Sequence, residues 1–430
     1  MTNTEFLYPW NQKLYESEAC EHFVDRELSY TVIENGYIVP SLARFADGGV
    51  FDENRNFLDK TACHNGIRID FPEDCEIVRS DETVIYLGNL FYHCWGHVIT
   101  DQLSRLWFVK YSEDYRTKFR NCALIYTEHN TACAPYVREL LEILGIDCDR
   151  LTHIRRVTQY KKIIIPDQCF FNEWPSNKKS ETRFFTKEYR QLIEEIRAWG
   201  RAHKRELPFD KVYYTYGKFL KILAPEKNRY EYVLEEFFRK LGYEIIAPEE
   251  YSFKEQLNIL LNCRCFASTI GSCSHNSVFL ENGTNVYLLL RADYFTGYQL
   301  AINEVWDQNV YLIDSQLSIL TDAKNPWSGP YYYCVSDNLM RCFSVGEETG
   351  GNCRKRDLRN FKRYVSVNAE CFDYAFDDHA EKYFLALQYL TEQENSRIAA
   401  AVSKMFRTFF YTARRTVLYL YYKVISKISH

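Results

Sequence analysis

The sequence lacks the features that mark several large classes of protein. The formal net charge of its 430 residues is only −5, which argues against a general nucleic-acid binder. No run of about 18 apolar residues occurs, so we expect no membrane-spanning helix. The segment 1–6 has neither the charged nor the apolar block of a signal peptide, so we expect no secretory leader. Together these absences favour a cytoplasmic globular protein.

Motifs for metal and phosphate chemistry are also missing. The 15 cysteines are odd in number, scattered and without a CxxC pair, which favours reduced thiols over a disulfide framework. Neither a GxxxxGK[ST] loop nor a DxD pair flanked by apolar residues is present, which argues against a phosphotransferase. His93 and His97 have the spacing of a zinc helix, but Cys94 stands where the HExxH motif has Glu. We therefore expect no metal site.

Two blocks of the chain alternate predicted strands with predicted helices, as a parallel α/β sheet requires. The first block has strands at 83–87, 122–126 and 162–166 and helices at 95–110, 136–144 and 181–205. The second has strands at 211–215, 243–246 and 264–269, a further apolar strand within 281–290, and helices at 231–241 and 253–261, the latter behind a Ser252–Glu255 capping box. We expect two Rossmann-like units that leave a cleft between their strand ends.

The most informative segment is 266–290, where a predicted strand reaches the small-residue turn Gly271-Ser272. A short helical pattern follows and ends at Asn282-Gly283, and a second apolar run comes after it. Backbone N–H groups at the start of a helix favour negative charge and can bind a phosphate without a metal. The turn therefore predicts a site for a nucleoside diphosphate, formed by unpaired amides.

A second candidate site lies on the helix predicted over 95–110. His97, Asp101 and Arg105 are spaced i, i+4 and i+8, so a regular α-helix places them on one face. Asp101 or His97 could take a proton from an acceptor hydroxyl, and Arg105 could hold the carboxylate or a phosphate. The alternative is an ordinary ladder of surface salt bridges.

Together these segments resemble glycosyltransferase family 61, which includes enzymes of bacterial capsular polysaccharide synthesis, plant xylan decoration and animal O-linked N-acetylglucosamine transfer. The resemblance covers about residues 80–300, with the segments in the family's order. Its first signature, an aromatic stretch with a histidine, an acidic residue four positions later and then an arginine, is similar to the segment 91–107. Its second, a strand ending in a small-residue turn before Asn and an apolar helix, is similar to 271–283.

Two departures from the family pattern affect the expected donor site. Many members have Gly-x-His-Gly-Ala before the turn, whereas Ile270 stands where that histidine would fall and His275 precedes Asn276. Many also carry an arginine after the first strand of the second half, where this chain has Tyr216. Lys218 and Lys221 are the nearest cations and are expected to contact phosphate.

The resemblance implies a GT-B architecture and an inverting, metal-independent glycosyltransferase with a nucleotide-sugar donor, UDP-sugar being the expected one, and no further cofactor. Asp101 or His97 would supply the base, with Asp101 favoured and His97 as its partner or as a ligand of the acceptor, and Arg105 beside them. The residues that the resemblance implies for the donor are those of the turn and the two lysines: Gly271, Ser272, Ser274, His275, Asn276, Lys218 and Lys221.

The expected domains follow from these assignments. Residues 1–205 form an acceptor-side Rossmann-like domain, 206–330 a donor-binding one, and 331–394 a closing segment that packs back on the body. The tail 395–430 has seven Lys or Arg and no Asp or Glu, with aromatic residues at helical spacings. Such a helix either lies on an anionic membrane surface or packs on the body with its cations in solvent.

We therefore expect a cytoplasmic enzyme, peripheral to the inner face of the membrane if its tail binds there. Its acceptor would be a glycan or a lipid-linked oligosaccharide in bacterial surface or capsular polysaccharide synthesis. The alternatives are a non-catalytic nucleotide- or glycan-binding protein and a nucleotide-dependent transferase of another kind.

Overall fold

The computed structural model shows a mixed α/β protein with two large sheets. The residues that it describes are 3–5, 15–16, 20–41, 48–62, 68–90, 94–127, 135–173, 182–218, 230–292, 294, 296–321, 329–346, 359–368, 386 and 390. Lys221 and the predicted tail 395–430 lie outside these residues.

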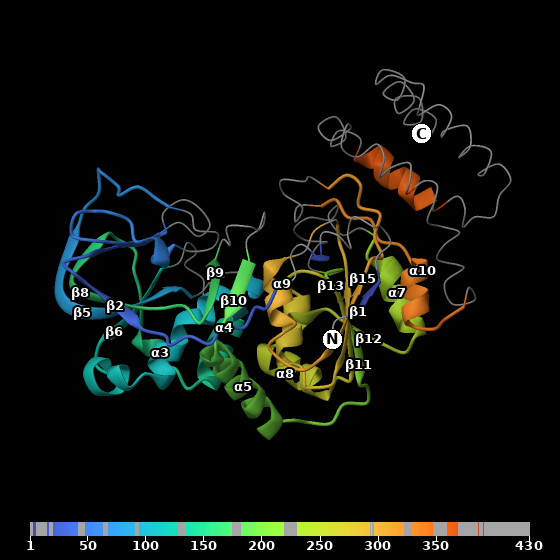
Figure 1. Ribbon diagram of the computed structural model, residues 1–430, viewed down its shortest axis with the longest axis horizontal. Helices are drawn as coiled ribbons and strands as arrows, with labels where there is room; N and C mark the ends of the chain where they lie inside the picture. Colours follow the sequence, from blue (N-terminus) through green and yellow to red (C-terminus); the bar gives the residue numbers. More distant parts are fainter. Residues whose placement is uncertain are drawn as a thin grey trace, which may run out of the picture.

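One sheet has six strands, all parallel, and is drawn at the right of Figure 1. Its strands are β1 (Asn3–Glu5), β11 (Lys211–Tyr214), β12 (Glu244–Ile246), β13 (Cys265–Thr269), β14 (Asn285–Leu289) and β15 (Asn309–Ile313). The four strands predicted in the second block are confirmed as β11 to β14. Their apolar side chains are largely buried, as expected of strands in a parallel sheet with both faces covered.

The order of this sheet locates its binding edge. The strands run β1-β15-β14-β13-β11-β12, so the chain passes from β11 outward to β12 and then crosses back to β13 on the other side. In open α/β sheets, ligands bind outside the carboxyl ends of the strands where the order reverses in this way. Here that point lies between Thr215–Lys218, after β11, and the turn after β13 that begins at Ile270.

The other sheet has seven strands and is mixed. Its strands are β2 (Tyr30–Glu34), β3 (Tyr37–Val39), β4 (Gly49–Phe51), β5 (Val78–Asn89), β6 (Ala123–Thr127), β7 (Leu151–His153) and β8 (Thr158–Pro166). Strands β8, β5, β6 and β7 lie side by side and parallel, whereas β2 and β3 pair antiparallel with β8. The three strands predicted in the first block are confirmed within β5, β6 and β8.

The helices of the described chain cover and join the two sheets. They include α4 (Pro135–Ile143), α5 (Lys187–Ala202), α7 (Tyr232–Lys240), α8 (Phe253–Asn262), α9 (Gly297–Ile302) and α10 (Asp337–Cys342). The predicted capping box of α8 is confirmed, because the Ser252 side chain accepts from the Glu255 amide and the Glu255 carboxylate accepts from the Ser252 amide.

The helix predicted over 181–205 is wrong at its start. Residues Thr182–Phe185 form strand β10, which pairs antiparallel with β9 (Phe170–Glu173). The cause is the aromatic cross-strand pair Phe171–Phe184, whose ring centroids lie 5.7 Å apart, since such pairs stabilise a strand more than isolated charges stabilise a helix. Helix α5 begins only after Thr186, at Lys187.

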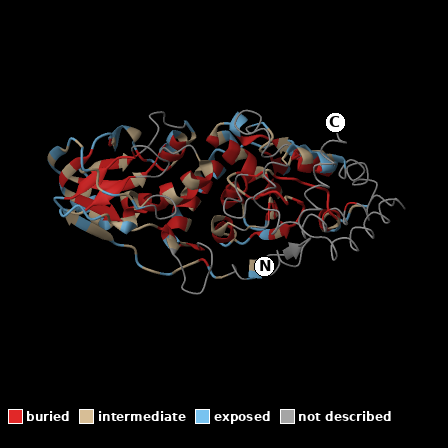
Figure 2. Ribbon diagram, turned by 90° about the horizontal axis from the view of Figure 1, so that it is seen from above, coloured by how far each residue is buried: buried red, intermediate tan, exposed pale blue. Residues whose placement is uncertain are grey.

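A single hydrophobic core extends from one sheet to the other. It contains Ile85 and Ile164 of the mixed sheet, Ile193 of α5, Leu257 of α8 and Phe266 of the parallel sheet. Helix α5 packs on α8, and both contact α4 (Figure 1). Buried residues accordingly fill both sheets and the helices between them in Figure 2. The helices therefore fix the carboxyl edge of one sheet relative to that of the other.

Candidate functional site

The helical run after β5 is less regular than the sequence suggests. It consists of α2 (Trp95–His97), the π-helical turn η3 (Val98–Gln102), the 3-10 turn η4 (Leu103–Arg105) and α3 (Leu106–Tyr111). The Thr100 hydroxyl donates to the Gly96 carbonyl at 2.7 Å, and such bonds loosen the backbone ladder of a helix. Single π-turns within helices often occur at functional sites.

His97 and Asp101 form a hydrogen-bonded pair at this π-turn. Nδ1 of His97 lies 2.8 Å from Oδ2 of Asp101, and the two side chains are 17% and 20% exposed. A partly exposed imidazole held by a carboxylate can exchange protons with a bound ligand. The structure thus brings the two predicted base candidates together.

Two residues that the sequence analysis missed extend this pair. The Tyr298 hydroxyl donates to the same Asp101 oxygen at 2.7 Å, and Nη2 of Arg183 donates to the Tyr298 hydroxyl at 2.6 Å. The Arg183 guanidinium also lies 4.1 Å from the centre of the Tyr298 ring. Arg183 comes from β10 and Tyr298 from α9, so two further elements contribute to the hydrogen-bond network of Asp101.

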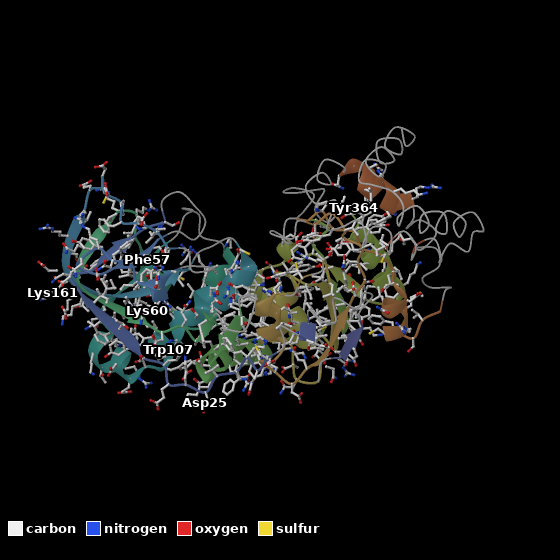
Figure 3. All side chains as sticks on the ribbon, turned by 45° about the horizontal axis from the view of Figure 1, so that its top comes forward. Asp25, Phe57, Lys60, Trp107, Lys161 and Tyr364 are labelled. Atoms are coloured by element: carbon white, nitrogen blue, oxygen red, sulfur yellow. The ribbon has the colours of Figure 1, made fainter. Side chains whose placement is uncertain are left out.

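Arg105 is buried, and its guanidinium reaches the backbone of a distant segment. Its side chain is 3% exposed, and Nη2 donates to the carbonyl of Lys60. Lys60 belongs to the half of the molecule built on the mixed sheet, as Figure 3 shows. The participation of Arg105 in a common site with His97 and Asp101 stays a prediction.

The turn after β13 is built differently from the prediction. The helix that follows it, η8 (Ser274–Phe279), is a six-residue 3-10 helix. The Gly271 amide donates to the Ser274 hydroxyl at 2.9 Å and the Cys273 amide donates to the Tyr216 hydroxyl at 2.8 Å. The amides of Ser274 and His275 both donate to the Gly271 carbonyl. The prediction of unpaired amides is wrong for these four groups, because side chains and the tight turn itself supply their acceptors.

Most of the predicted donor residues on this turn have structural partners. Ser274 and Asn276 are fully buried. The Ser274 hydroxyl donates to the Gly271 carbonyl at 2.8 Å, and the Asn276 amide group donates to the Cys273 carbonyl at 2.9 Å. These two side chains therefore shape the turn.

The turn and the helical run after β5 contact each other directly. The indole N–H of Trp95 donates to Oδ1 of Asn276 at 2.9 Å, and Sγ of Cys94 lies 3.6 Å from the Ser272 hydroxyl. Gly96 is held still closer, since a Cβ atom there would lie 2.8 Å from Nδ1 of His275 and 3.0 Å from the Ser272 hydroxyl. Two segments about 180 residues apart in the sequence thus meet at one seam, which we call the 96/275 seam.

His275 lies at this seam as a neutral imidazole. It is 6% exposed, and burial together with the nearby His97 lowers its pKa to about 3. Among the described residues no side chain pairs with its ring nitrogens, and the backbone of Gly96 is the polar group beside the ring. Its ring faces Tyr298 at a centroid distance of 6.0 Å. A buried nitrogen left without a partner costs roughly 1–3 kcal/mol, so this arrangement suits a group that meets a ligand.

Of the two predicted lysines, only Lys218 lies among the described residues, and its ammonium group is directed to Glu250. Lys218 is exposed and its ammonium group binds both oxygens of Glu250, which raises the pKa of Lys218. Lys221 lies outside the described residues. The cation that does reach the turn is Arg291, which follows β14 and lies 4.1 Å over the ring of Tyr216. Tyr216 occupies the position where many family 61 members have arginine.

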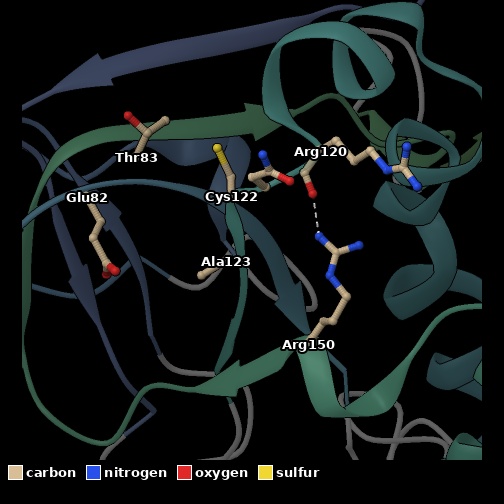
Figure 4. Close-up of a pocket in the computed structure, with 7 residues that line it drawn as sticks. Glu82, Thr83, Arg120, Cys122, Ala123 and Arg150 are labelled. Carbon is tan, nitrogen blue, oxygen red and sulfur yellow. Dashed lines mark hydrogen bonds between the residues drawn. The ribbon is translucent and has the colours of Figure 1, made fainter.

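Two pockets lie elsewhere, at the amino ends of β5 and β6. One, of 640 Å³, is lined by Glu82, Thr83, Arg120, Asn121, Cys122, Ala123 and Arg150 (Figure 4). The other, of 490 Å³, shares Arg120 and Arg150 with it. Ligands of α/β sheets bind at the carboxyl ends of strands, so neither pocket is the candidate site.

The segment that contains the turn after β13 is similar to a known protein family. The family model described as Glycosyltransferase 61 matches residues 226–287. The matched segment runs from before α7 into β14 and contains the whole turn after β13. The protein is a glycosyltransferase. No curated protein matches the sequence. A glycosyltransferase acts on a sugar donor and a glycan acceptor, so the predicted enzyme class is confirmed over the non-catalytic binding protein.

The described residues of the glycosyltransferase were searched for metal sites and membrane-spanning helices. Within them, no group of three or more His, Cys, Asp or Glu residues is arranged to hold a metal ion. Within the same residues, no helix has the length and apolar character needed to cross a bilayer. Metal independence and location stay predictions.

Proposed function

We propose that this glycosyltransferase transfers a sugar, with inversion, from a nucleoside-diphosphate donor to a hydroxyl of a glycan acceptor. The observation that carries the proposal is the 96/275 seam, where the His97–Asp101 pair meets the turn at the reversal point of the parallel sheet. Inverting transfer needs a base on one side of the sugar and a bound leaving group on the other. The two edges that meet here come from different sheets, which supports a GT-B-like arrangement.

His97 is the group we propose as the base. Oδ2 of Asp101 already accepts from the Tyr298 hydroxyl and pairs with Nδ1 of His97, and both bonds stabilise the carboxylate as an anion. An imidazole that donates from Nδ1 carries its lone pair on Nε2. Asp101 therefore fixes the tautomer of His97, and the Tyr298–Arg183 pair fixes Asp101.

The proposed reaction is a single displacement at the anomeric carbon of the donor sugar. The acceptor oxygen forms a bond to the anomeric carbon while its proton passes to Nε2 of His97. The bond between the anomeric carbon and the diphosphate oxygen breaks, and the diphosphate leaves with the electron pair. The resulting imidazolium is stabilised by the Asp101 carboxylate at 2.8 Å.

Binding of the donor can be measured without knowing the sugar. In a thermal scan, one or more of UDP, GDP, CDP and ADP at about 100 times its Kd should raise the free energy of unfolding by about 2.7 kcal/mol. The stabilisation should survive addition of a chelator, because the proposed mechanism uses no metal. Loss of stabilisation on adding the chelator would contradict the metal-free mechanism, and absence of stabilisation by every nucleotide would contradict the donor class.

We also propose a cytoplasmic enzyme of bacterial surface polysaccharide synthesis that reaches lipid-linked acceptors through its basic tail. The supports are the resemblance to capsular polysaccharide enzymes and the seven cations in 395–430. Deleting residues 400–430 should shift the protein from the membrane fraction to the soluble fraction of a cell lysate. Immunoblotting of the two fractions tests this, and a full-length protein already found in the soluble fraction would contradict it.

A further inference from the structure

Arg291 is a partly buried cation beside the reversal point of the parallel sheet, hydrogen-bonded to Tyr331 but with one guanidinium nitrogen unpartnered among the described residues. It follows β14, whose neighbour β13 leads into the 271 turn. Its Nη2 atom is buried and has no hydrogen-bond partner among the described residues, although the side chain as a whole keeps partial exposure. An unmade hydrogen bond on a buried charged group is costly, so an anionic ligand that supplied the acceptor would be stabilised.

The guanidinium is held in place by its neighbours. It lies 4.1 Å over the ring of Tyr216 and 5.4 Å from that of Tyr331, and Nε donates to the Thr269 hydroxyl at 3.3 Å. Burial alone would lower the pKa of Arg291, but the nearby tyrosines and Glu231 raise it well above its ordinary value. The group is therefore a fixed, fully charged fork of donors, which suits bidentate recognition of phosphate oxygens.

Gly271 brings the backbone of the turn against this fork. Its φ is +145°, and a Cβ atom there would lie 2.9 Å from both Cζ and Nη1 of Arg291. Any side chain at this position would therefore cover the guanidinium. Glycine is the residue that leaves such a close approach open.

The other sources of positive charge at this edge are already engaged. Four amides of the turn donate within the protein, and Lys218 is bound to Glu250. Glu231 is buried beside the cluster, and its carboxylate accepts from the Tyr213 hydroxyl and the Tyr216 amide. These observations leave Arg291 as the described cation best placed to meet an anion.

We propose that Arg291 binds the diphosphate of the sugar donor, with Gly271 providing the access. This inference rests on the proposed function, because it names the phosphate-binding group of the same site. Arg291 stabilises negative charge on the leaving diphosphate while His97, across the seam, takes the proton of the acceptor.

Calorimetry with purified full-length variants tests the assignment. The probes are inorganic pyrophosphate and the nucleoside diphosphate that stabilises the wild-type protein in the thermal scan. Arg291→Met should weaken binding of both by about 10- to 100-fold, because a charge-assisted hydrogen bond is lost. Arg291→Lys keeps the charge without the fork and should fall between Arg291→Met and wild type. Arg264→Met, at the opposite end of β13 where Arg264 is 85% exposed, is the matched control and should bind as wild type does.

The possible results distinguish failure of the proposed function from failure of the Arg291 assignment. A wild-type protein that binds neither probe contradicts the proposed function and this assignment together. A wild-type protein that binds, with Arg291→Met and Arg291→Lys binding equally well, contradicts the Arg291 assignment alone. A loss in Lys218→Met without a loss in the Arg291 variants would move phosphate binding to Lys218. If Arg291→Met fails to melt cooperatively, the binding of the two probes to Arg291→Lys is the test. Wild-type affinity in Arg291→Lys would then contradict the assignment.

Discussion

Replacing His97 by Gln should lower kcat by about 10²- to 10⁴-fold, because general base catalysis contributes that much to proton transfer. Glutamine keeps the length and a hydrogen-bonding group near Asp101 but has no lone pair of comparable basicity. The measurement is sugar transfer or donor hydrolysis at saturating donor, with the melting temperature of each variant as a control for folding. Retention of wild-type kcat by His97→Gln would contradict the assignment of the base.

Asp101→Asn serves as the companion variant for the same prediction. Asparagine has nearly the same shape, yet its amide can donate to Nδ1 and so favours the other imidazole tautomer. Nε2 would then carry the proton, and kcat should again fall by a factor of about 10²–10⁴. Tyr298→Phe removes the second hydrogen bond to Asp101 at 2.7 Å and should produce a smaller loss with a shifted pH profile. An unchanged pH profile in Tyr298→Phe would give Tyr298 a purely structural role.

Gly96→Ala is the second variant for which we expect a large effect. The new methyl group would lie 2.8 Å from Nδ1 of His275, and that ring is buried and cannot move aside at low cost. Overpacking of this kind costs about 1–3 kcal/mol of stability. A shift of about 1 Å between base and donor would lower kcat by about 100-fold. The measurements are chemical denaturation for stability and single-turnover kinetics for activity.

Two controls separate this effect from a general effect of alanine. Gly346→Ala adds a methyl group where no atom lies within 4 Å and should leave both stability and activity unchanged. His275→Ala removes the ring that the new methyl group meets, so the double variant Gly96→Ala/His275→Ala should recover stability relative to Gly96→Ala. Strict additivity of the two changes would show that residues 96 and 275 do not contact each other in solution.

The sequence was sufficient to predict strands β5, β6, β8 and β11 to β14, but not the remaining strands of the two sheets. The apolar runs at 211–215 and 264–269 predicted β11 and β13 to within a residue. The antiparallel strands β2 and β3 were not predicted, because such short strands show weak alternation and depend on their partner β8. Strand β10 was taken for helix because the charges around it resemble those of α5.

Single residues of the site were predicted from the sequence, but the hydrogen bonds that join them to other segments were not. His97 and Asp101 were found because side chains four residues apart still meet across the π-turn. Tyr298 and Arg183 gave no local signal, since their network exists only when α9 and β10 meet. Arg291 did have one, because it directly follows a strand of the parallel sheet beside the reversal point.

The prediction of bare amides failed for a physical reason that a sequence does not display. Whether an N–H group is free depends on which side chains reach it. Here the hydroxyls of Ser274 and Tyr216 do so from three and 57 residues away. The small residues of a turn therefore predict the path of its backbone better than they predict its hydrogen bonds.

The structure of the enzyme bound to the nucleoside diphosphate selected in the thermal scan would test the central claim most directly. We expect the phosphates against Gly271 and the Arg291 guanidinium, with the leaving oxygen directed toward the 96/275 seam and His97. Phosphates bound instead in the groove of Arg120 and Arg150, at the other end of the mixed sheet, would contradict it.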